Sequence, residues 1–375
     1  MKVALVHFWL VGMRGGERVL EALCRLYPEA DIFTHVYDPD QTSETIKRHN
    51  IKTTFINRLP RARKWYQNYL PLMPLALAEL DLSEYDLVIS SESGPAKGVI
   101  TGPDTLHVCY CHSPMRYAWD MYHEYKKHLS LPKRLLAAPV MNYMRNWDIA
   151  SSRYPDVIVA NSNFVARRVK KFWGRDSFVV HPPVAVDDFT PGPSSQRQDF
   201  YLLFGELVSY KRPDLAVNAF SYPGSARKLV VLGDGEQKAA LQKIAGPNVT
   251  FLGRQPFSVV KDYLATCKAL IFPGLEDFGI VPVEALASGT PVIAYAKGGA
   301  LDTVKDGLSG VFFHKQTEED LLAAIHKFED NQNNFEAASL AREAQKFHEQ
   351  NFALQMQEII NNSFKNKGRA HSAPE

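Results

Sequence analysis

Glu276 and Glu284 are the residues of this sequence whose types and spacing most clearly suggest a binding site. Pro273 and Gly274 end the apolar run before them, and Pro282 suits the first turn of a helix, where a missing N–H costs nothing. The segment therefore predicts a strand, a loop carrying one carboxylate, and a helix carrying the other. Both would face the carboxyl end of a parallel strand, where open α/β sheets bind ligands. An ordinary βα unit with two surface carboxylates is the alternative.

Such a site needs a parallel sheet, and both halves of the chain alternate strand-like and helix-like segments. Residues 15–26 carry apolar side chains at helical spacing, and residues 164–173 are a second expected helix. The expected strands are residues 3–6, 30–34, 87–90, 106–110, 157–160 and 178–180 in the first half, and 201–204, 228–232, 249–252, 269–272, 291–294 and 310–313 in the second. This alternation predicts an α/β protein with a mostly parallel sheet in each half.

The length of 375 residues corresponds to about two domains. Residues 188–199 have the proline, glycine and serine content of a linker, and residues 181–184 are interpreted as a hinge. From Glu318 the chain is expected to be helical, and after Lys365 to become a polar tail.

The composition is that of a soluble globular protein, with 45% hydrophobic and 22% charged residues. A net charge of +2 argues against a nucleic-acid partner recognised by bulk charge. The first residues are typical of a strand rather than a signal peptide, and no apolar run approaches the length of a membrane-spanning helix. We therefore expect a cytoplasmic protein.

The four cysteines, Cys24, Cys109, Cys111 and Cys267, match no disulfide framework and no zinc-binding spacing. The run Cys109-Tyr-Cys111-His112 suggests a metal site, but alternate positions of a strand point to opposite faces. No metal ligand set is therefore predicted.

The segment around the two carboxylates resembles a known signature. Glu276 and Glu284 with seven residues between them, followed by Ala-Ser-Gly-Thr-Pro-Val, are similar to the Glu-x7-Glu motif of retaining family-4 glycosyltransferases. The resemblance runs from Gly15 to about Gly310. It implies the GT-B fold: two Rossmann-like domains facing across a cleft that holds a nucleotide sugar, and a C-terminal helix crossing back to the first domain.

The resemblance assigns a role to each part of the chain. Residues 1–186 are expected to bind the acceptor and residues 187–345 the nucleotide-sugar donor. Residues 346–365 are the expected returning helix, and residues 366–375 the polar tail.

The donor diphosphate is expected to contact two glycine-bearing loops. Gly15 and Gly16 open a helix and let backbone N–H groups approach an anion, although a plain tight turn is the alternative. In the similar enzymes a later loop supplies an Arg directly after a glycine and a Lys five residues on. Lys211 matches the Lys, but Glu206 stands where the Arg is usual, so Arg212 is expected to take part of its role.

Further donor contacts are implied by the same resemblance. Glu276 is expected to hydrogen-bond sugar hydroxyls and Glu284 the ribose hydroxyls. The remaining expected donor-binding residues are Gly233, Arg254 and Gln255, which border the nucleobase, and Phe278, Gly279 and Ile280 in the Glu-x7-Glu segment.

His112 follows a strand end and matches the family histidine near the reacting sugar, so we expect His112, Lys211 and Glu276 to be catalytic. The motif around His112 is most similar to bacterial mannosyltransferases of O-antigen and exopolysaccharide assembly, which use GDP-mannose. A saccharide, in particular one linked to a polyprenyl diphosphate, is the implied acceptor. Its expected contacts are Arg14, Arg116, Tyr117 and Trp119.

Residues 45–78 contain no acidic residue, and basic side chains alternate there with aromatic and aliphatic ones. This composition suits an anionic membrane surface, such as a lipid-linked acceptor presents, at the inner face of the cytoplasmic membrane. A solvated basic patch over ordinary core residues is the alternative.

The resemblance implies transfer with retention and an α-linked product, in which the leaving phosphate oxygen takes the acceptor proton and no enzyme nucleophile is needed. Catalysis is then mainly charge stabilisation and positioning. No Asp-x-Asp motif is present, so no metal cofactor is expected.

Three alternatives stay open at this point. The donor could be a UDP-hexose, the enzyme could be a nucleotide-sugar epimerase or hydrolase, or the chain could be a non-catalytic nucleotide-sugar-binding subunit. Glu206 in place of Arg motivates the last of these.

Overall fold

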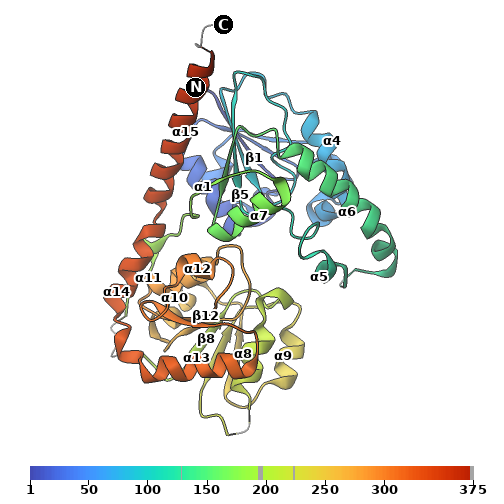
Figure 1. Ribbon diagram of the computed structural model, residues 1–375. Coiled ribbons are helices and arrows are strands. Elements are labelled where there is room, and N and C mark those ends of the chain that lie inside the picture. Colours follow the sequence, from blue (N-terminus) through green and yellow to red (C-terminus); the bar gives the residue numbers. More distant parts are fainter. Residues whose placement is uncertain (128, 193–196, 223, 372–375) are drawn as a thin grey trace. The chain divides into compact units, whose positions relative to one another are not determined.

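The computed structural model describes residues 1–127, 129–192, 197–222 and 224–371, and it divides the chain into two compact units (Figure 1). The N-terminal unit consists of Met1–Pro183 and Phe352–Glu375, and the C-terminal unit of Val184–Asn351. Each unit has its own hydrophobic core. The division after Pro183 falls inside the expected hinge, slightly before the expected domain boundary at residue 186.

The sheet of the N-terminal unit has seven parallel strands in the order β3-β2-β1-β4-β5-β6-β7. They are β1 (Val3–His7), β2 (Asp31–Thr34), β3 (Ile51–Thr53), β4 (Leu87–Glu92), β5 (Leu106–Cys111), β6 (Val157–Ala160) and β7 (Phe178–Val179). β1 pairs with β2 on one side and with β4 on the other. The direction in which strands are added to the sheet therefore reverses between β1 and β4.

The C-terminal unit has six parallel strands in the order β10-β9-β8-β11-β12-β13. They are β8 (Tyr201–Phe204), β9 (Leu229–Leu232), β10 (Val249–Gly253), β11 (Leu270–Phe272), β12 (Val292–Tyr295) and β13 (Gly310–Phe313). β8 pairs with β9 and with β11, so the reversal here lies between β8 and β11. Both sheets have the strand order of Rossmann-like domains, as the sequence predicts.

Helices connect the strands. The N-terminal unit contains α1 (Gly15–Leu26), α2 (Glu44–Lys47), α3 (Ala62–Trp65), α4 (Met73–Ala78), α5 (Tyr122–Lys127), α6 (Leu131–Ser151), α7 (Asn163–Trp173) and most of α15 (Glu349–His371). The C-terminal unit contains α8 (Pro213–Phe220), α9 (Lys238–Ile244), α10 (Phe257–Thr266), α11 (Ile280–Ala287), α12 (Ala300–Thr303), α13 (Glu318–Asp330) and α14 (Ala337–Ala344). Short 3₁₀ turns include η3 (Tyr66–Leu72) and η6 (Ser209–Lys211).

The strands found include every strand expected from the sequence, displaced by at most two residues at an end. Apolar runs were sufficient because strands such as β1, β4 and β5 are buried along their whole length. Several elements, among them β3 and α6, were not predicted. β3 is only half-buried, and α6 carries apolar residues over its whole surface as well as Pro139 in its interior, so neither shows a clear period.

The last helix, α15, corrects two expectations about the end of the chain. It begins at Glu349 rather than at residue 346, and it continues to His371, so the expected polar tail from residue 366 is helical as far as the structure describes it. Phe352, Met356 and Ile360 on this helix are buried in the core of the N-terminal unit. The ammonium group of Lys367 lies 3.2 Å from the Asp156 carboxylate.

The expected linker at residues 188–199 is also corrected in part. Phe189 at its beginning is buried in the core of the C-terminal unit. Residues 193–196 lie outside the described residues.

Candidate functional site

Each sheet offers one place for a ligand site, because open α/β sheets bind ligands at the carboxyl ends of the strands where the strand order reverses. In the C-terminal unit that place is the end of β8 and β11, and in the N-terminal unit it is the end of β1 and β4.

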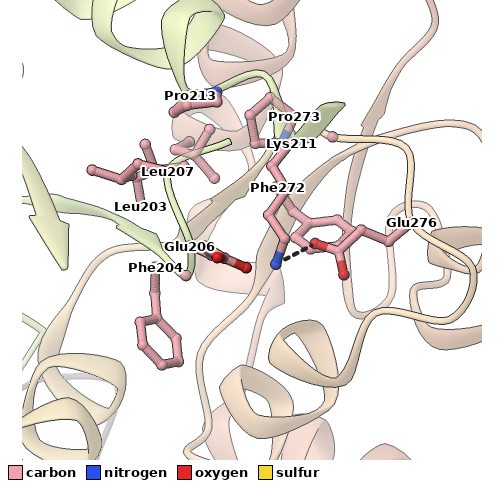
Figure 2. Close-up of a pocket in the computed structure, with 12 residues that line it drawn as sticks. Leu203, Phe204, Glu206, Leu207, Lys211, Pro213, Phe272, Pro273 and Glu276 are labelled. Carbon is pink, nitrogen blue, oxygen red and sulfur yellow. Dashed lines mark ion pairs between the residues drawn. The ribbon is translucent and has the colours of Figure 1, made fainter. Parts of the chain in front are cut away.

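The C-terminal unit has a pocket at its reversal point, and it contains two of the three residues expected to be catalytic (Figure 2). Lys211 lies in the loop after β8, and Glu276 in the loop after β11. The residues that line the pocket are Leu203, Phe204, Gly205, Glu206, Leu207, Lys211, Pro213, Ile271, Phe272, Pro273, Gly274 and Glu276.

Close backbone packing holds the loops around this pocket in place. Gly233 has φ +139°, and a Cβ atom there would lie 1.9 Å from the carbonyl oxygen of Gly205. A Cβ atom on Gly274 would lie 2.7 Å from Cα of Lys211. Real Cβ atoms do not approach other atoms so closely, so only glycine lets the loops after β8, β9 and β11 meet.

Lys211 and Glu276 form an ion pair across the pocket, with Nζ 3.1 Å from Oε1. Burial alone would lower the pKa of Lys211, but the Glu276 charge outweighs it and the pKa is raised. Glu206 also contributes to this rise, and Figure 2 shows the ammonium end of Lys211 between the Glu206 and Glu276 carboxylates. Lys211 is therefore a full positive charge at neutral pH.

Arg212 does not line the pocket with Lys211. Its guanidinium makes hydrogen bonds of 2.9–3.1 Å to both carboxylate oxygens of Asp214. Its backbone adopts the left-handed conformation, with φ 52°, directly before α8. The Asp214 pair occupies the Nε and Nη2 edge of the guanidinium, and the donor-binding role of Arg212 stays a prediction.

The Glu-x7-Glu segment forms the loop and helix expected for it. Gly279 precedes α11 with φ 85°, and Glu284 lies half-buried one turn into the helix. Ile280 is half-buried at the first position of the helix. The Phe278 ring is buried against Phe347, with ring centroids 5.5 Å apart, so only its backbone remains for a ligand.

The residues expected at the nucleobase lie at the ends of neighbouring strands. Gly233 follows β9 and donates its N–H to the Gly253 carbonyl at the end of β10. Arg254 is exposed, and the Gln255 amide donates to the Leu252 carbonyl. Their place on this edge agrees with the expectation, while base contact itself stays a prediction.

In the N-terminal unit the reversal point carries a chain of polar side chains that ends in His112. Nε2 of His112 lies 2.8 Å from Oγ of Ser91 on β4, and the same Oγ lies 3.0 Å from Nδ1 of His7 at the end of β1. Nε2 of His7 lies 3.6 Å from Oε1 of Glu17 on α1. These side chains come from three strand ends and a helix.

The first turn of α1 covers this chain. A Cβ atom on Gly16 would lie 3.6 Å from Cε1 of His7 and 3.7 Å from Nε2 of His112. Arg14 and Gly15 precede it, with the Arg14 side chain exposed. The Glu17 carboxylate accepts a hydrogen bond of 2.9 Å from the Arg14 N–H, which satisfies one of the free donors at the helix start.

The electrostatics of this site keep His112 neutral and Glu17 charged. Burial, and secondarily the His7 ring, lower the pKa of His112 to about 3. Burial alone would raise the pKa of Glu17, but the His7 ring, 3.6 Å away, and the backbone donors lower it overall. A neutral imidazole beside a ligand site can accept a hydrogen bond but does not hold a charge.

Three of the four residues expected to contact an acceptor, Arg116, Tyr117 and Trp119, lie in the loop after His112, whereas Arg14 precedes α1. The Trp119 indole N–H donates to Asp148 at 2.7 Å, and its ring stacks on Phe172, so Trp119 holds this loop to α6 and α7. The Tyr117 hydroxyl is buried and makes no hydrogen bond within the described residues. Arg116 is half-buried. Acceptor contact by these residues stays a prediction.

Beneath this loop lies a buried ionic cluster that the sequence analysis missed. Nζ of Lys97 lies 2.5 Å from Oδ1 of Asp148 and 3.3 Å from Oε1 of Glu92, and all three side chains are fully buried. Burial alone would lower the pKa of Lys97, but the two carboxylates raise it. The Glu92 carbonyl accepts the His112 N–H, which ties the cluster to the site.

His7, Glu17 and Ser91 were also missed as site residues. Each stands in an apolar or helical stretch with no motif of its own. For His7 and Ser91 the one signal is that a polar side chain ends or interrupts an otherwise apolar strand, and Glu17 on α1 has no such signal. Alternate positions of the run 109–112 point to opposite faces, as expected. Cys109 and Cys111 lie in a buried cluster with Trp173, whereas the His112 ring lies against the Tyr110 ring.

Among the residues that the structure describes, no group of three or more His, Cys, Asp or Glu side chains is arranged to hold a metal ion. Among the same residues, no helix combines the length and the apolar character that crossing a membrane requires.

Two protein-family models together match most of the chain. Residues 13–188 match Glycosyltransferase Family 4, and residues 187–347 match Glycosyl transferases group 1.

Curated relatives match over part of their length. A D-inositol 3-phosphate glycosyltransferase of Mycobacteroides abscessus is 33% identical over 166 residues, 39% of this chain and 38% of the relative. The protein of that name from Geodermatophilus obscurus is 34% identical over 200 residues, 45% of this chain and 44% of the relative. This chain thus spans less than half the length of these relatives.

Solved structures match over nearly the whole chain. Anabaena Alr3699/HepE in complex with UDP superposes with a TM-score of 0.71 at 18% identity, covering 96% of this chain and 100% of that one. Sucrose-phosphate synthase from Thermosynechococcus elongatus gives 0.70 at 18% identity, covering 98% and 100%. The lipopolysaccharide outer core galactosyltransferase WaaB gives 0.65 at 17% identity, covering 98% and 100%. At these identities the likeness concerns the fold, which is GT-B.

Proposed function

Two glycosyltransferase domains make up residues 13–347 of this chain, and from them we propose that it is a hexosyltransferase. It transfers a hexose from a nucleoside diphosphate sugar to a saccharide acceptor with retention, which gives an α-linkage. The observation that carries the proposal is the charged Lys211 paired with Glu276 at the strand-order reversal of the C-terminal unit. A sugar that leaves a diphosphate develops negative charge on the β-phosphate, and a fixed cation stabilises that charge.

The proposed role of each residue follows from the chemistry of the two sites. Lys211 binds the diphosphate, Glu276 accepts hydrogen bonds from sugar hydroxyls, and Glu284 accepts them from the ribose. His112 of the N-terminal unit contacts the sugar as a neutral imidazole, in keeping with its lowered pKa of about 3. The leaving phosphate oxygen takes the acceptor proton, so that neither an enzyme nucleophile nor a metal ion is needed.

For the donor we propose GDP-mannose, on the similarity of the His112-Ser-Pro-Met-Arg-Tyr117 run to mannosyltransferases. A UDP-hexose is the second candidate. Anabaena Alr3699/HepE, one of the structures with the same fold, was solved with UDP and with UDP-glucose.

The first prediction concerns the product. Purified protein given GDP-mannose and a lipid-linked saccharide is expected to form an α-mannosyl linkage, seen by anomeric NMR, with full activity in EDTA. UDP-glucose and UDP-galactose are the matched donors, and a mixture without acceptor is the control. A β-linkage would contradict retention, and loss of activity in EDTA would contradict metal independence. An epimer or rapid free sugar without acceptor would favour the epimerase or hydrolase alternative.

We also propose that the N-terminal unit contacts an anionic membrane surface, where a polyprenyl-diphosphate-linked acceptor would lie. Within residues 45–78 the structure separates two kinds of basic side chain. Lys47, Lys52 and Arg63 form ion pairs within the fold. Arg58, Arg61 and Lys64 are exposed.

The beginning of α6 adds apolar side chains to this basic stretch. Leu131, Leu135 and Leu136 are 76%, 80% and 63% exposed, an unusual state for leucine at three positions of one helix. No acidic residue occurs from residue 125 to 147. Lys133 of α6 donates a hydrogen bond of 2.9 Å to Asn68 of η3, so the leucines lie beside the basic stretch. Exposed leucines among cations fit the interface of an anionic bilayer.

The second prediction tests this surface. Wild-type protein is expected to float with vesicles that contain phosphatidylglycerol, and less so with pure phosphatidylcholine or at high salt. The double variant Leu135→Ser/Leu136→Ser should bind about tenfold more weakly or worse, because each buried leucine contributes roughly 1.5–3 kcal/mol. Leu354→Ser, at a position 57% exposed on α15, is the matched control. Equal flotation of all three proteins would contradict the proposal.

A further inference from the structure

We infer that Glu17 sets the tautomer of His112 through His7 and Ser91, so that Nδ1 of His112 is left as a hydrogen-bond acceptor for a hydroxyl of the donor sugar. Glu17, His7 and Ser91 are positioning residues in this scheme, since each acts through the next. The contact between His112 and a sugar hydroxyl rests on the proposed function, whereas the tautomer of His112 is a property of the free protein.

The geometry supplies a path of one charge contact followed by two hydrogen bonds. Oε1 of Glu17 is 3.6 Å from Nε2 of His7, and Nδ1 of His7 is 3.0 Å from Oγ of Ser91. Oγ of Ser91 is 2.8 Å from Nε2 of His112. Nε2 of His7 is buried, and within the described residues it makes no hydrogen bond, so the Glu17 carboxylate is the charge it faces.

The chemistry of the groups decides which of them donates and which accepts in each contact of the path. An ionised carboxylate can only accept, so it favours the His7 tautomer with its proton on Nε2. Nδ1 of that ring then accepts, and the Ser91 hydroxyl donates to it. A hydroxyl has one proton, so Ser91 must accept from Nε2–H of His112. Nδ1 of His112 is left without a proton.

The free end of this path is open to a ligand. The His112 ring is partly exposed. None of the hydrogen bonds found among residues 1–127, 129–192, 197–222 and 224–371 uses its Nδ1. A sugar hydroxyl that donates to Nδ1 keeps its own lone pairs for other donors. The opposite tautomer would present an N–H there and would reverse the role of the hydroxyl.

Glu17→Gln is the variant that tests the direction of the path. The Arg14 N–H, 2.9 Å from Oε2, requires an acceptor at that position. The carbonyl of the glutamine should therefore take it and turn the amide NH₂ toward His7. His7 must then accept at Nε2 and donate from Nδ1 to Ser91. Ser91 in turn donates to Nε2 of His112, so the proton of the His112 ring lies on Nδ1. The helix start keeps its acceptor, so the fold is expected to persist.

The readout is the ¹⁵N chemical-shift signature of the His112 tautomer in ligand-free protein. It is recorded at pH 8, above the ordinary pKa of histidine of about 6.5. Wild type should show Nε2–H and Glu17→Gln should show Nδ1–H. With donor and acceptor, kcat/KM of the variant should fall about tenfold or more, because one hydrogen bond to the sugar is lost.

Two further variants make the result specific. Glu21→Gln changes the next acidic residue of the same helix, which pairs with Arg18 instead of His7, and should alter neither the tautomer nor the rate. Ser91→Ala cuts the path, so adding Glu17→Gln to it should leave the His112 tautomer unchanged. An unchanged tautomer in Glu17→Gln would overturn the inference even in an active enzyme. Absence of transfer by the wild type would refute the proposed function and leave the tautomer result standing.

Discussion

Lys211→Ala is expected to remove most of the thermal stabilisation that a nucleoside diphosphate gives to the wild-type protein. The Glu276 carboxylate raises the pKa of Lys211, so wild type has a permanent cation at the proposed diphosphate site. A charge-assisted hydrogen bond contributes roughly 1.5–3 kcal/mol, which corresponds to a loss of about 10- to 100-fold in affinity. The measurement is the shift in melting temperature with GDP, UDP, ADP and dTDP.

The four nucleotides also decide the donor class. A ligand at about 100 times its Kd stabilises the folded protein by roughly 2.7 kcal/mol, enough to see clearly. A selective GDP response that disappears in Lys211→Ala would support the mannosyl donor and the diphosphate loop together. A selective UDP response would keep the mechanism and remove GDP-mannose. No response to any nucleotide would contradict the proposed site. Lys327→Ala, an exposed lysine on α13, is the matched control.

Glu206→Gln at the same pocket is expected to tighten diphosphate binding, whereas Lys211→Ala is expected to weaken it. Glu206 lines the pocket with Lys211 and so places a carboxylate beside the proposed diphosphate position. Two like charges about 7 Å apart in water repel by roughly 0.6 kcal/mol, a factor of about three in affinity. Diphosphate binding, measured by calorimetry, should therefore tighten by about that factor. Weaker binding would mean that Glu206 orients Lys211 or accepts a hydrogen bond from the donor.

Lys97→Met is expected to give the largest loss of stability in the N-terminal unit. Lys97 is the only cation within reach of Glu92 and Asp148 among the ion pairs of the described residues, and all three side chains are fully buried. Removing one partner of a buried ion pair costs about 3–5 kcal/mol, because the remaining charge stays buried without compensation. Here two carboxylates lose their partner.

Tryptophan fluorescence during urea unfolding is the measurement. All five tryptophans of the chain, Trp9, Trp65, Trp119, Trp147 and Trp173, belong to the N-terminal unit. Lys97 itself lies over the rings of Trp147 and Trp173, at 5.1 Å and 4.5 Å from their centroids. The signal therefore reports on this unit alone. Lys171→Met, at an exposed position of α7, should change the free energy of unfolding by no more than about 0.5 kcal/mol. Equal stability of the two variants would show that Lys97 is not needed to compensate the carboxylates.

The position of the C-terminal pocket was largely predictable because its parts are local in the sequence. Pro273, Gly274 and Pro282 mark the ends of a strand and the start of a helix by their backbone chemistry alone. Once these elements are known, parallel strands bring their carboxyl ends to one edge, and Lys211 and Glu276 follow. The apolar runs of the buried strands likewise predicted both sheets.

The sequence alone thus determined the two parallel sheets and the strand ends where a site could form, since those features depend on short runs of residues. Only the tertiary structure showed that Arg212 turns to Asp214, that the Trp119 N–H is taken by Asp148, and that the leucines of α6 are exposed. It also brought His7, Ser91 and His112 into one hydrogen-bonded path, although 84 positions separate the first two. Such contacts depend on which strands become neighbours in the sheet, and no local pattern carries that information.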